Sequence, residues 1–266
     1  MPDKKLFQIV TRSGVRTETI LLLKDGGKSA SDLCSYFKIA PQELAPRTRE
    51  LVESGLIIKK DKSYYLTDLG QIITEKYSEF KNLLSFIGDK QEFLKEHDLT
   101  DIPFELQLRF EMLSQSKVVC PENHSIFDTH DGFMDNIVKS KYLKGLASIM
   151  FPSYPSFFNR LAESGTKVEI IVTESIYSVL KTKYKDQLIE YLNYEDAHMY
   201  ICNNNKLAFV VTDSFFSISL FFKNGIFDHV SDIVSFDKDG IEWGEMLFDY
   251  YVKQSIPVKI EDLVSS

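Results

Sequence analysis

The stretch PQELAPRTRELVES, residues 41–54, decides the fold. Its inward-facing side chains recur at spacings of three and four, which predicts a helix with one buried face. That face consists of Leu44, Thr48, Leu51 and Val52. Pro41 suits the first turn of the helix, and Gly55 suits its end. Pro46 removes one helical hydrogen bond, so it should bend the helix or shift its start.

The flanking sequence predicts the elements that surround this helix. Two shorter helices are expected upstream, over residues 17–25 and 29–37, and a turn at 38–40 follows them. Downstream, two β-type runs around a polar pair predict a hairpin over 56–67, and a further helix over 68–80 follows. The order helix, helix, turn, helix, hairpin, helix is typical of a winged helix-turn-helix domain.

This domain order predicts which side chains read DNA. The second helix of the pair would enter the major groove, where arginine pairs with guanine and glutamine pairs with adenine. Lysines at the tip of the hairpin would reach phosphates, and a tyrosine there would pack on the helix or contact a sugar. The predicted DNA-binding residues are Gln42, Pro46, Arg47, Arg49, Lys59, Lys60, Lys62 and Tyr64. The alternative is an ordinary helical subdomain with a solvated hairpin, since Glu43, Glu50 and Glu53 dilute the positive face.

Charge is divided unevenly along the 266 residues, whose net charge is −8. Residues 1–80 hold 13 lysines and arginines against 11 acidic residues, whereas the remainder holds 18 against 28. The N-terminal part is therefore the region that can face phosphates without repulsion. The three cysteines are far apart, which argues against disulfides and structural zinc and fits a reducing cytoplasm. A signal peptide and a membrane span are not expected, because long apolar runs are missing.

The rest of the chain predicts a larger domain of mixed α/β type. Residues 81–115 read as a helical linker, and β-type runs alternate with helices over 116–266. We therefore expect a fold of the α+β and α/β classes. It would consist of a winged helix-turn-helix at 1–80 and an α/β regulatory domain built on a mixed sheet.

An effector site in this domain would need a concave, mostly apolar pocket with a few polar groups. Aromatic residues in FPSYPSFF, residues 151–158, follow a predicted strand end, where ligands often bind in α/β sheets. The candidate effector-binding residues are His124, His130 and Tyr154. The alternative is that these aromatics belong to the core. The sequence shows none of the GxxxxGK[ST], GxGxxG, GxSxG or HExxH motifs, so we expect no catalytic residue, metal or cofactor.

The run LAPRTRELVESGLIIKKDKSYYLTDLGQ, residues 44–71, resembles the ArsR-like winged-helix transcription regulators of methanogenic archaea. The regulatory part of those proteins is called the methanogenesis regulatory protein middle domain. Similar runs continue downstream: HDLTDIP (97–103), FPSYPSFFNRL (151–161), GTKVEIIVTE (165–174), LAFVVTDSFFSISLFFKNGIFD (207–228) and IEWGEMLFDYY (241–251). The resemblance implies a regulator of methanogen metabolism that binds promoter DNA as a dimer, and it assigns no ligand.

The sequence therefore predicts a cytoplasmic, homodimeric DNA-binding transcription regulator without enzymatic activity. By analogy with winged-helix regulators, the dimer would form through the helix near Asp68–Phe80. A small-molecule effector or a protein partner would act at the α/β domain. The alternatives are a small-molecule enzyme, or a protein-docking adaptor, that carries the winged helix as an interaction module.

Overall fold

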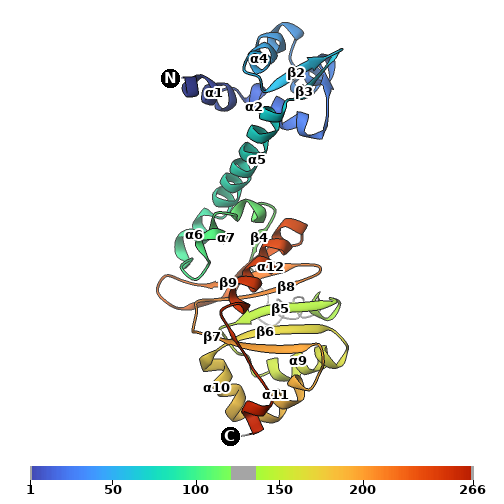
Figure 1. Ribbon diagram of the computed structural model, residues 1–266. Helices are drawn as coiled ribbons and strands as arrows, with labels where there is room; N and C mark the ends of the chain where they lie inside the picture. Colours follow the sequence, from blue (N-terminus) through green and yellow to red (C-terminus); the bar gives the residue numbers. More distant parts are fainter. Residues whose placement is uncertain (1, 121–135, 265–266) are drawn as a thin grey trace. The chain divides into compact units, whose positions relative to one another are not determined.

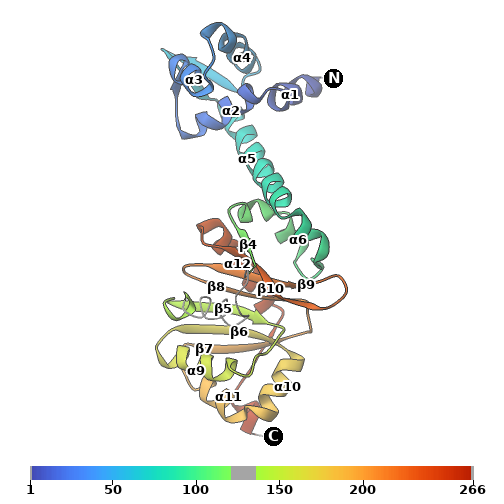
Figure 2. The same ribbon diagram turned by 180° about the vertical axis from the view of Figure 1, so that it is seen from behind.

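The computed structural model describes residues 2–120 and 136–264 of the chain (Figures 1 and 2). The chain divides into two compact units, Met1–Lys81 and Asn82–Ser266. Each unit has its own hydrophobic core, and each is described separately below.

The first unit is a winged helix-turn-helix. Its helices and strands, in chain order, are α1 (Pro2–Thr11), α2 (Gly14–Leu22), the 3-10 turn η1 (Leu23–Asp25), β1 (Lys28–Ser29), α3 (Ala30–Phe37), α4 (Pro41–Glu53), β2 (Ile57–Lys60), β3 (Ser63–Leu66) and the start of α5 (Asp68–Asp89). The three strands form an antiparallel sheet in the order β1-β3-β2. The predicted order of elements is confirmed, and α1 and the short strand β1 are additions that the sequence did not predict.

Local sequence signals set the boundaries of these helices. Ser29 and Asp32 form a capping box at the start of α3, in which each side chain bonds the backbone N–H of the other. Lys38 ends α3 in the left-handed conformation, with φ of 55°. The Thr67 hydroxyl accepts from the backbone N–H of Gly70 at 3.0 Å, so it caps α5.

The described residues of the second unit form an eight-stranded sheet. Its described elements after α5 are α6 (Gln91–Glu96), α7 (Phe104–Gln107), η2 (Phe110–Leu113), β4 (Lys117–Val119), β5 (Tyr142–Ala147), α9 (Tyr154–Glu163), β6 (Lys167–Thr173), α10 (Glu174–Lys183), α11 (Lys185–Leu192), β7 (Ala197–Cys202), β8 (Leu207–Thr212), β9 (Phe216–Phe221), β10 (Phe227–Ser235), α12 (Lys238–Val252), β11 (Ile256–Pro257) and α13 (Glu261–Val264). The strand order is β11-β7-β6-β5-β8-β9-β10-β4. Strands β5, β6 and β7 are parallel and the other pairs are antiparallel, which confirms the predicted mixed sheet.

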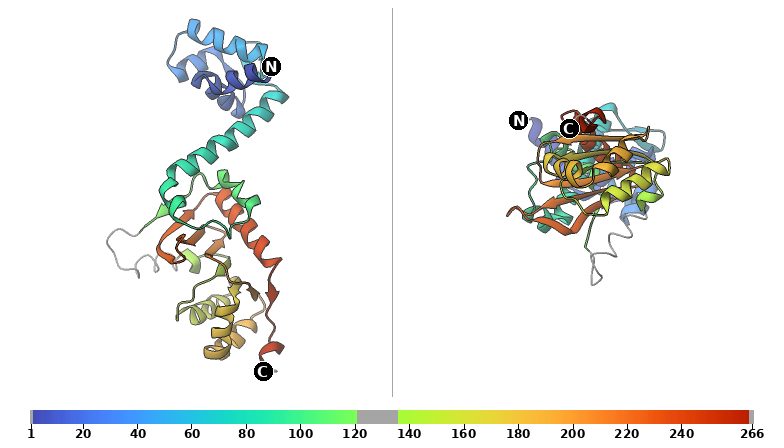
Figure 3. Two further views of the ribbon diagram at one scale, coloured as in Figure 1. Left: turned by 90° about the vertical axis from the view of Figure 1, so that its left-hand side faces the viewer. Right: turned by 90° about the horizontal axis from the view of Figure 1, so that it is seen from below.

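Helices cover different parts of the two sheet faces (Figure 3). Successive side chains of β8 point to opposite faces of the sheet, so Phe209 belongs to one core cluster and Val210 to the other. On the Val210 face, α9, α10 and α11 pack against β6 and β7. On the Phe209 face, α12 packs against β5, β8 and β9.

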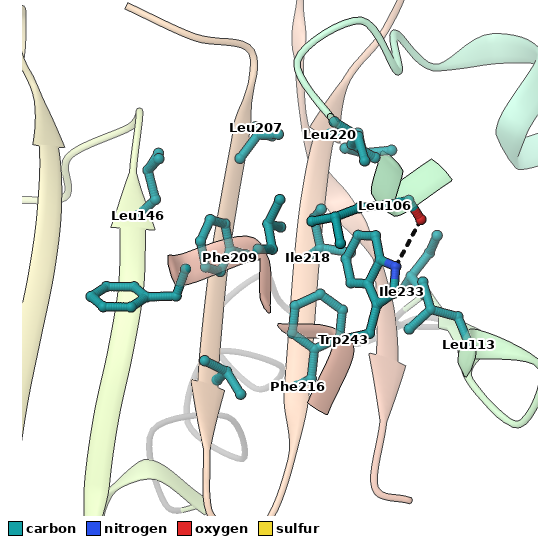
Figure 4. Close-up of a cluster of buried hydrophobic side chains, with 14 of the residues drawn as sticks. Leu106, Leu113, Leu146, Leu207, Phe209, Phe216, Ile218, Leu220, Ile233 and Trp243 are labelled. Atoms are coloured by element: carbon teal, nitrogen blue, oxygen red, sulfur yellow. Dashed lines mark hydrogen bonds between the residues drawn. The ribbon is translucent and has the colours of Figure 1, made fainter. Parts of the chain in front are cut away.

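Residues 82–113 contribute to the core of the second unit. Phe86 of α5 and Phe110 of η2 are buried in the cluster on the Phe209 face, and their ring centroids lie 5.0 Å apart. Trp243 of α12 is fully buried there, and its indole N–H donates to the Leu106 carbonyl at 3.0 Å (Figure 4). The segment 81–115, which the sequence predicts as a linker, thus contains helices that pack as part of a domain.

Candidate nucleic-acid interface and ligand cavity

Helix α4 presents its polar face to solvent and buries most of its apolar face, although Val52, predicted to be on the buried face, is 40% exposed. Leu44, Thr48 and Leu51 are almost completely buried in the core of the first unit. Gln42, Pro46 and Arg49 are exposed, and Arg47 is half-exposed. The helix begins at Pro41 and continues through Pro46, so Pro46 does not shift the start of the helix. The four predicted base-reading residues of this helix therefore lie on its accessible side.

The two arginines of α4 have no carboxylate partner among the ion pairs of the described residues. The Arg47 guanidinium donates to the Glu43 carbonyl of its own helix at 2.7 Å. Glu50, which dilutes the positive face, pairs instead with Arg16 of α2. Arg16 also donates to the Ile9 carbonyl at 2.9 Å and thereby joins α1, α2 and α4. Sequence reasoning missed Arg16, because its carboxylate partner is 34 positions away in the chain.

The hairpin β2–β3 forms a lysine-tipped wing. Lys60 pairs with Ser63 in register, and Asp61 takes a left-handed conformation with φ of 54° in the two-residue turn between them. Lys59, Lys60 and Lys62 are exposed. Three flexible cations on an exposed turn suit phosphate contacts, which position a protein on DNA without reading sequence.

Tyr64, of the predicted DNA-binding set, packs against α4, which is one of the two roles expected for it. Its side chain is 9% exposed and belongs to the core of the first unit. Thr48 of α4 donates to the Tyr64 hydroxyl at 3.4 Å, and the Lys59 ammonium lies 5.6 Å from the Tyr64 ring centroid. Side chains alternate along a strand, so Tyr65 points outward where Tyr64 points inward. Tyr64 therefore packs beneath the exposed surface of the first unit, between α4 and the wing.

The second unit contains a cavity of about 1020 Å³ on the sheet face that carries Val210. Of the candidate effector residues, Tyr154 lines this cavity, and His124 and His130 lie outside the described residues. Tyr154 is half-buried at the start of α9, where burial and, second, the nearby charge of Asp232 raise its pKa to about 12. Its hydroxyl is protonated at neutral pH, as in any ordinary tyrosine, and the raised pKa extends this to more alkaline solutions.

Asp232 and His229 of β10 also line this cavity and were missed in the sequence. Asp232 accepts hydrogen bonds from Ser217, at 3.4 Å, and from Ser219 at a shorter distance. The signal that could have identified this site is the alternation FSISLFF, which places two serines on one face of an otherwise apolar strand.

The described residues contain no group of three or more histidine, cysteine or acidic side chains that could hold a metal ion. Within residues 2–120 and 136–264, the search for a helix long and apolar enough to cross a membrane found none. Cys202 is buried, and burial raises the pKa of its thiol to about 11, which disfavours the reactive thiolate.

Comparisons with known proteins match most of the chain to one family. The model described as the N-terminal domain of methanogenesis regulatory protein FilR1 matches residues 4–87, and the model of its middle domain matches residues 126–254. The curated methanogenesis regulatory protein FilR1 of Methanothrix harundinacea (strain 6Ac) is 24% identical over 264 residues. That match covers 97% of this chain, and the chain spans 59% of the length of the relative.

Two solved structures show weaker similarity. The structure of TrmBL2, described as an archaeal chromatin protein, has a TM-score of 0.43 at 11% identity, covering 96% of this chain and all of that one. The dimethyltransferase RosA of Streptomyces davawensis has a TM-score of 0.26 at 14% identity, covering 76% of this chain and 64% of that one. Both TM-scores are too low to bear on function.

Proposed function

We propose that the chain is a DNA-binding transcription regulator of methanogenesis-related genes, because models of two domains of methanogenesis regulatory protein FilR1 match residues 4–87 and 126–254. One observation carries this proposal: the exposed face of α4 holds Arg47 and Arg49 without carboxylate partners among the described residues, beside a wing with three exposed lysines. The helix would enter the major groove, and the wing would contact phosphates. The protein would then act in the cytoplasm and have no enzymatic activity.

The direct test is fluorescence anisotropy with the promoter of the protein's own gene. A bidentate contact between arginine and guanine contributes about 1–3 kcal/mol, so the loss of two such contacts in the double variant Arg47→Ala and Arg49→Ala should weaken binding roughly thirtyfold to ten-thousandfold. The matched control, Lys238→Ala with Lys253→Ala, removes two exposed positive charges from the second unit and should bind like the parent. Unchanged affinity of the arginine variant, with folding intact, would refute the assignment of α4.

We also propose that the regulator is a homodimer, with its interface on the first part of α5. Leu69, Ile72 and Phe80 are 63%, 61% and 53% exposed, which is unusual for large apolar side chains on one helix face. A second copy of the chain would cover them and place two α4 helices about one helical turn of DNA apart. Ile72→Glu should yield monomers in sedimentation equilibrium and weaken promoter binding, and the neighbouring control Gln71→Glu should remain dimeric. A dimeric Ile72→Glu variant would exclude this interface.

The second unit would be the regulatory part, with an effector in its cavity. A ligand that binds one DNA-binding state more tightly than another changes promoter occupancy. The cavity lies on a sheet face and combines many apolar residues with a few polar groups, as ligand sites usually do.

A further inference from the structure

A second, smaller cavity lies in the core of the second unit, where α9, α10 and α11 pack on the sheet. Its volume is about 40 Å³. Apolar side chains make up most of its lining, among them Ile176 and Leu180 of α10 and Val172 of β6. The described residues that line it include no aspartate, glutamate, lysine, arginine or histidine. An ionised ligand would therefore lose its hydration here without gaining a counter-ion, which is costly.

Asn159 of α9 brings an unsatisfied polar atom to this lining. The residue is 6% exposed, and its amide nitrogen donates to the Gln187 carbonyl at 3.1 Å and to the Glu190 carboxylate at 2.7 Å. These two acceptors fix the orientation of the amide, because a flipped amide would place its oxygen against both of them. The amide oxygen Oδ1 is buried and has no hydrogen-bond partner among the described residues. A buried acceptor without a partner is costly, so a ligand that donates one hydrogen bond would relieve that cost.

Water is a poor occupant of such a cavity. A buried water needs about two to four polar partners. Tyr191, another buried polar residue of the lining, already donates its hydroxyl to the Val168 carbonyl at 2.8 Å. A water bonded to Asn159 would therefore leave its second hydrogen facing apolar side chains. A short alcohol presents one O–H to the amide oxygen and carbon atoms to the rest of the lining.

We infer that this cavity binds a short-chain alcohol, whose hydroxyl donates to Oδ1 of Asn159 and whose alkyl group lies among the apolar side chains. One water requires roughly 10–15 Å³ of such space. The volume of about 40 Å³ therefore suits a ligand of about three non-hydrogen atoms, such as ethanol. This site is separate from the larger effector cavity proposed above, and ethanol binding is measured without DNA. A chain that binds ethanol but not its promoter would refute the proposed function and leave this inference intact.

NMR of the full chain, with ¹³C at the methionine methyl groups, tests this binding. Met150 and Met199 line the cavity, whereas Met112 and Met246 pack in the cluster on the opposite, Phe209 face of the sheet. Ethanol should shift the signals of Met150 and Met199 and leave those of Met112 and Met246 in place. The shifts should saturate in the millimolar range, which is about the limit for so small a ligand. Equal shifts of all four methyl groups, shifts without saturation, or no shift would each overturn the inference.

Acetonitrile is the matched probe for the hydrogen bond to Asn159. It has as many non-hydrogen atoms as ethanol, but it accepts a hydrogen bond and donates none. It should bind about threefold to tenfold more weakly than ethanol, because Oδ1 stays unsatisfied. In Asn159→Leu, which removes the acceptor, the two probes should bind alike. Equal binding of both probes to the parent would refute the contact with Asn159.

A filling variant tests the location of the site. Leu180→Phe should occupy the cavity with its ring and abolish the ethanol-dependent shifts of Met150 and Met199. The matched control, Val179→Phe, adds the same ring at a position of α10 that is 36% exposed, and it should bind ethanol as the parent does. If Asn159→Leu does not fold, the probe pair in the parent and the two phenylalanine variants still decide the question. Ethanol binding that persists in Leu180→Phe would refute the assignment to this cavity.

Discussion

His97 forms a buried pair with Asp228 in the second unit. His97 is 2% exposed, and its Nε2 lies 3.1 Å from an oxygen of Asp228, while its Nδ1 lies 2.7 Å from the Phe93 carbonyl. Each ring nitrogen therefore has an oxygen within hydrogen-bond distance. The ring also stacks between Phe93, at 3.9 Å, and Phe222, at 4.5 Å. The ring is thus held by an oxygen at each nitrogen and by an aromatic ring on each face.

Removing this ring should be costly. His97→Ala removes one partner of the buried Asp228, which keeps the bonds from the backbone N–H groups of Val230 and Ser231. It also opens a gap between two phenyl rings, so we expect a loss of about 3–5 kcal/mol in the free energy of unfolding. His198→Ala changes an exposed histidine of the same unit and should stay within about 0.5 kcal/mol of the parent. Urea denaturation of the full chain measures both. Equally small losses would show that the pair does not stabilise the fold.

The lowered pKa of Asp98, the residue after His97, leads us to expect that the stability of the fold depends on pH. It accepts from the Thr100 hydroxyl at 2.6 Å, from the Lys206 ammonium at 2.9 Å and from the Thr100 backbone N–H at 3.0 Å. These bonds lower its pKa from 3.8 to about 2. A carboxylate whose pKa is lower in the folded state stabilises it above the unfolded pKa, and this contribution is lost as the pH falls through the folded value.

The comparison of Asp98→Asn with the parent isolates this contribution. The parent should melt at a higher temperature above pH 4, and the difference in Tm should shrink as the pH falls from 4 toward 2. Asp249→Asn, which changes an exposed carboxylate, should show no such trend. A difference in Tm that stays constant over this range would contradict the role given to Asp98.

Helix α5 begins in close contact with the chain segment before the wing. A Cβ atom on Gly70 would lie 1.9 Å from the Leu56 carbonyl oxygen, whereas a Cβ on Gly88 of the same helix would meet nothing within 4 Å. The glycine at position 70 therefore lets α5 approach the backbone of Leu56, which lies between α4 and β2.

The two glycines give opposite predictions for the same substitution. Gly70→Ala must displace backbone atoms, so we expect a loss of about 1–3 kcal/mol in the free energy of unfolding. Gly88→Ala should stabilise the helix by about 0.5–1 kcal/mol, since glycine is a poor helix former. Thermal unfolding monitored by circular dichroism compares them. If both variants shift in the same direction, the close approach at Gly70 has no energetic importance.

The elements that the sequence predicts best are those with strong local signals. The capped helices α3 and α4, the hairpin around Asp61 and the strand β6 all follow from periodicity, caps and turn residues. Strand β10 was missed because Asp228, His229, Ser231 and Asp232 interrupt its apolar pattern. Asp228, Ser231 and Asp232 have partners that are distant in the chain, and local periodicity carries no record of such partners.

Residues of the candidate sites were likewise predictable only where the local sequence pattern determines which way they face. Exposure of Arg47, Arg49 and the wing lysines could be inferred from the helical and β periods, because burial on one face leaves the other face exposed. The inward direction of Tyr64 required the register of β3, and the cavity required the strand order of the sheet. Tyr154 was identified from its local aromatic run, whereas Asp232 became a candidate only when β9 and β10 were paired.

Charge in the whole molecule is partitioned between the two units in opposite senses. Residues 1–80 carry an excess of two positive charges, and the remainder carries an excess of ten negative charges. Exposed charges farther apart than about 8 Å are largely screened at physiological ionic strength, so local lysines and arginines decide phosphate contacts and the net charge of −8 does not. DNA affinity should therefore follow the charges of the first unit.

The salt dependence of promoter binding tests this partition. On a plot of log K against log salt, the slope falls by about 0.9 for each phosphate contact that is removed. The wing variant with Lys59, Lys60 and Lys62 changed to Gln should therefore lose about two to three units of slope. A matched variant with Lys238, Lys253 and Lys259 changed to Gln alters the net charge equally in the second unit, and its slope should equal that of the parent. Two variants with equal slopes would mean that overall charge governs binding, and the lysine wing would then have no specific contact with the DNA backbone.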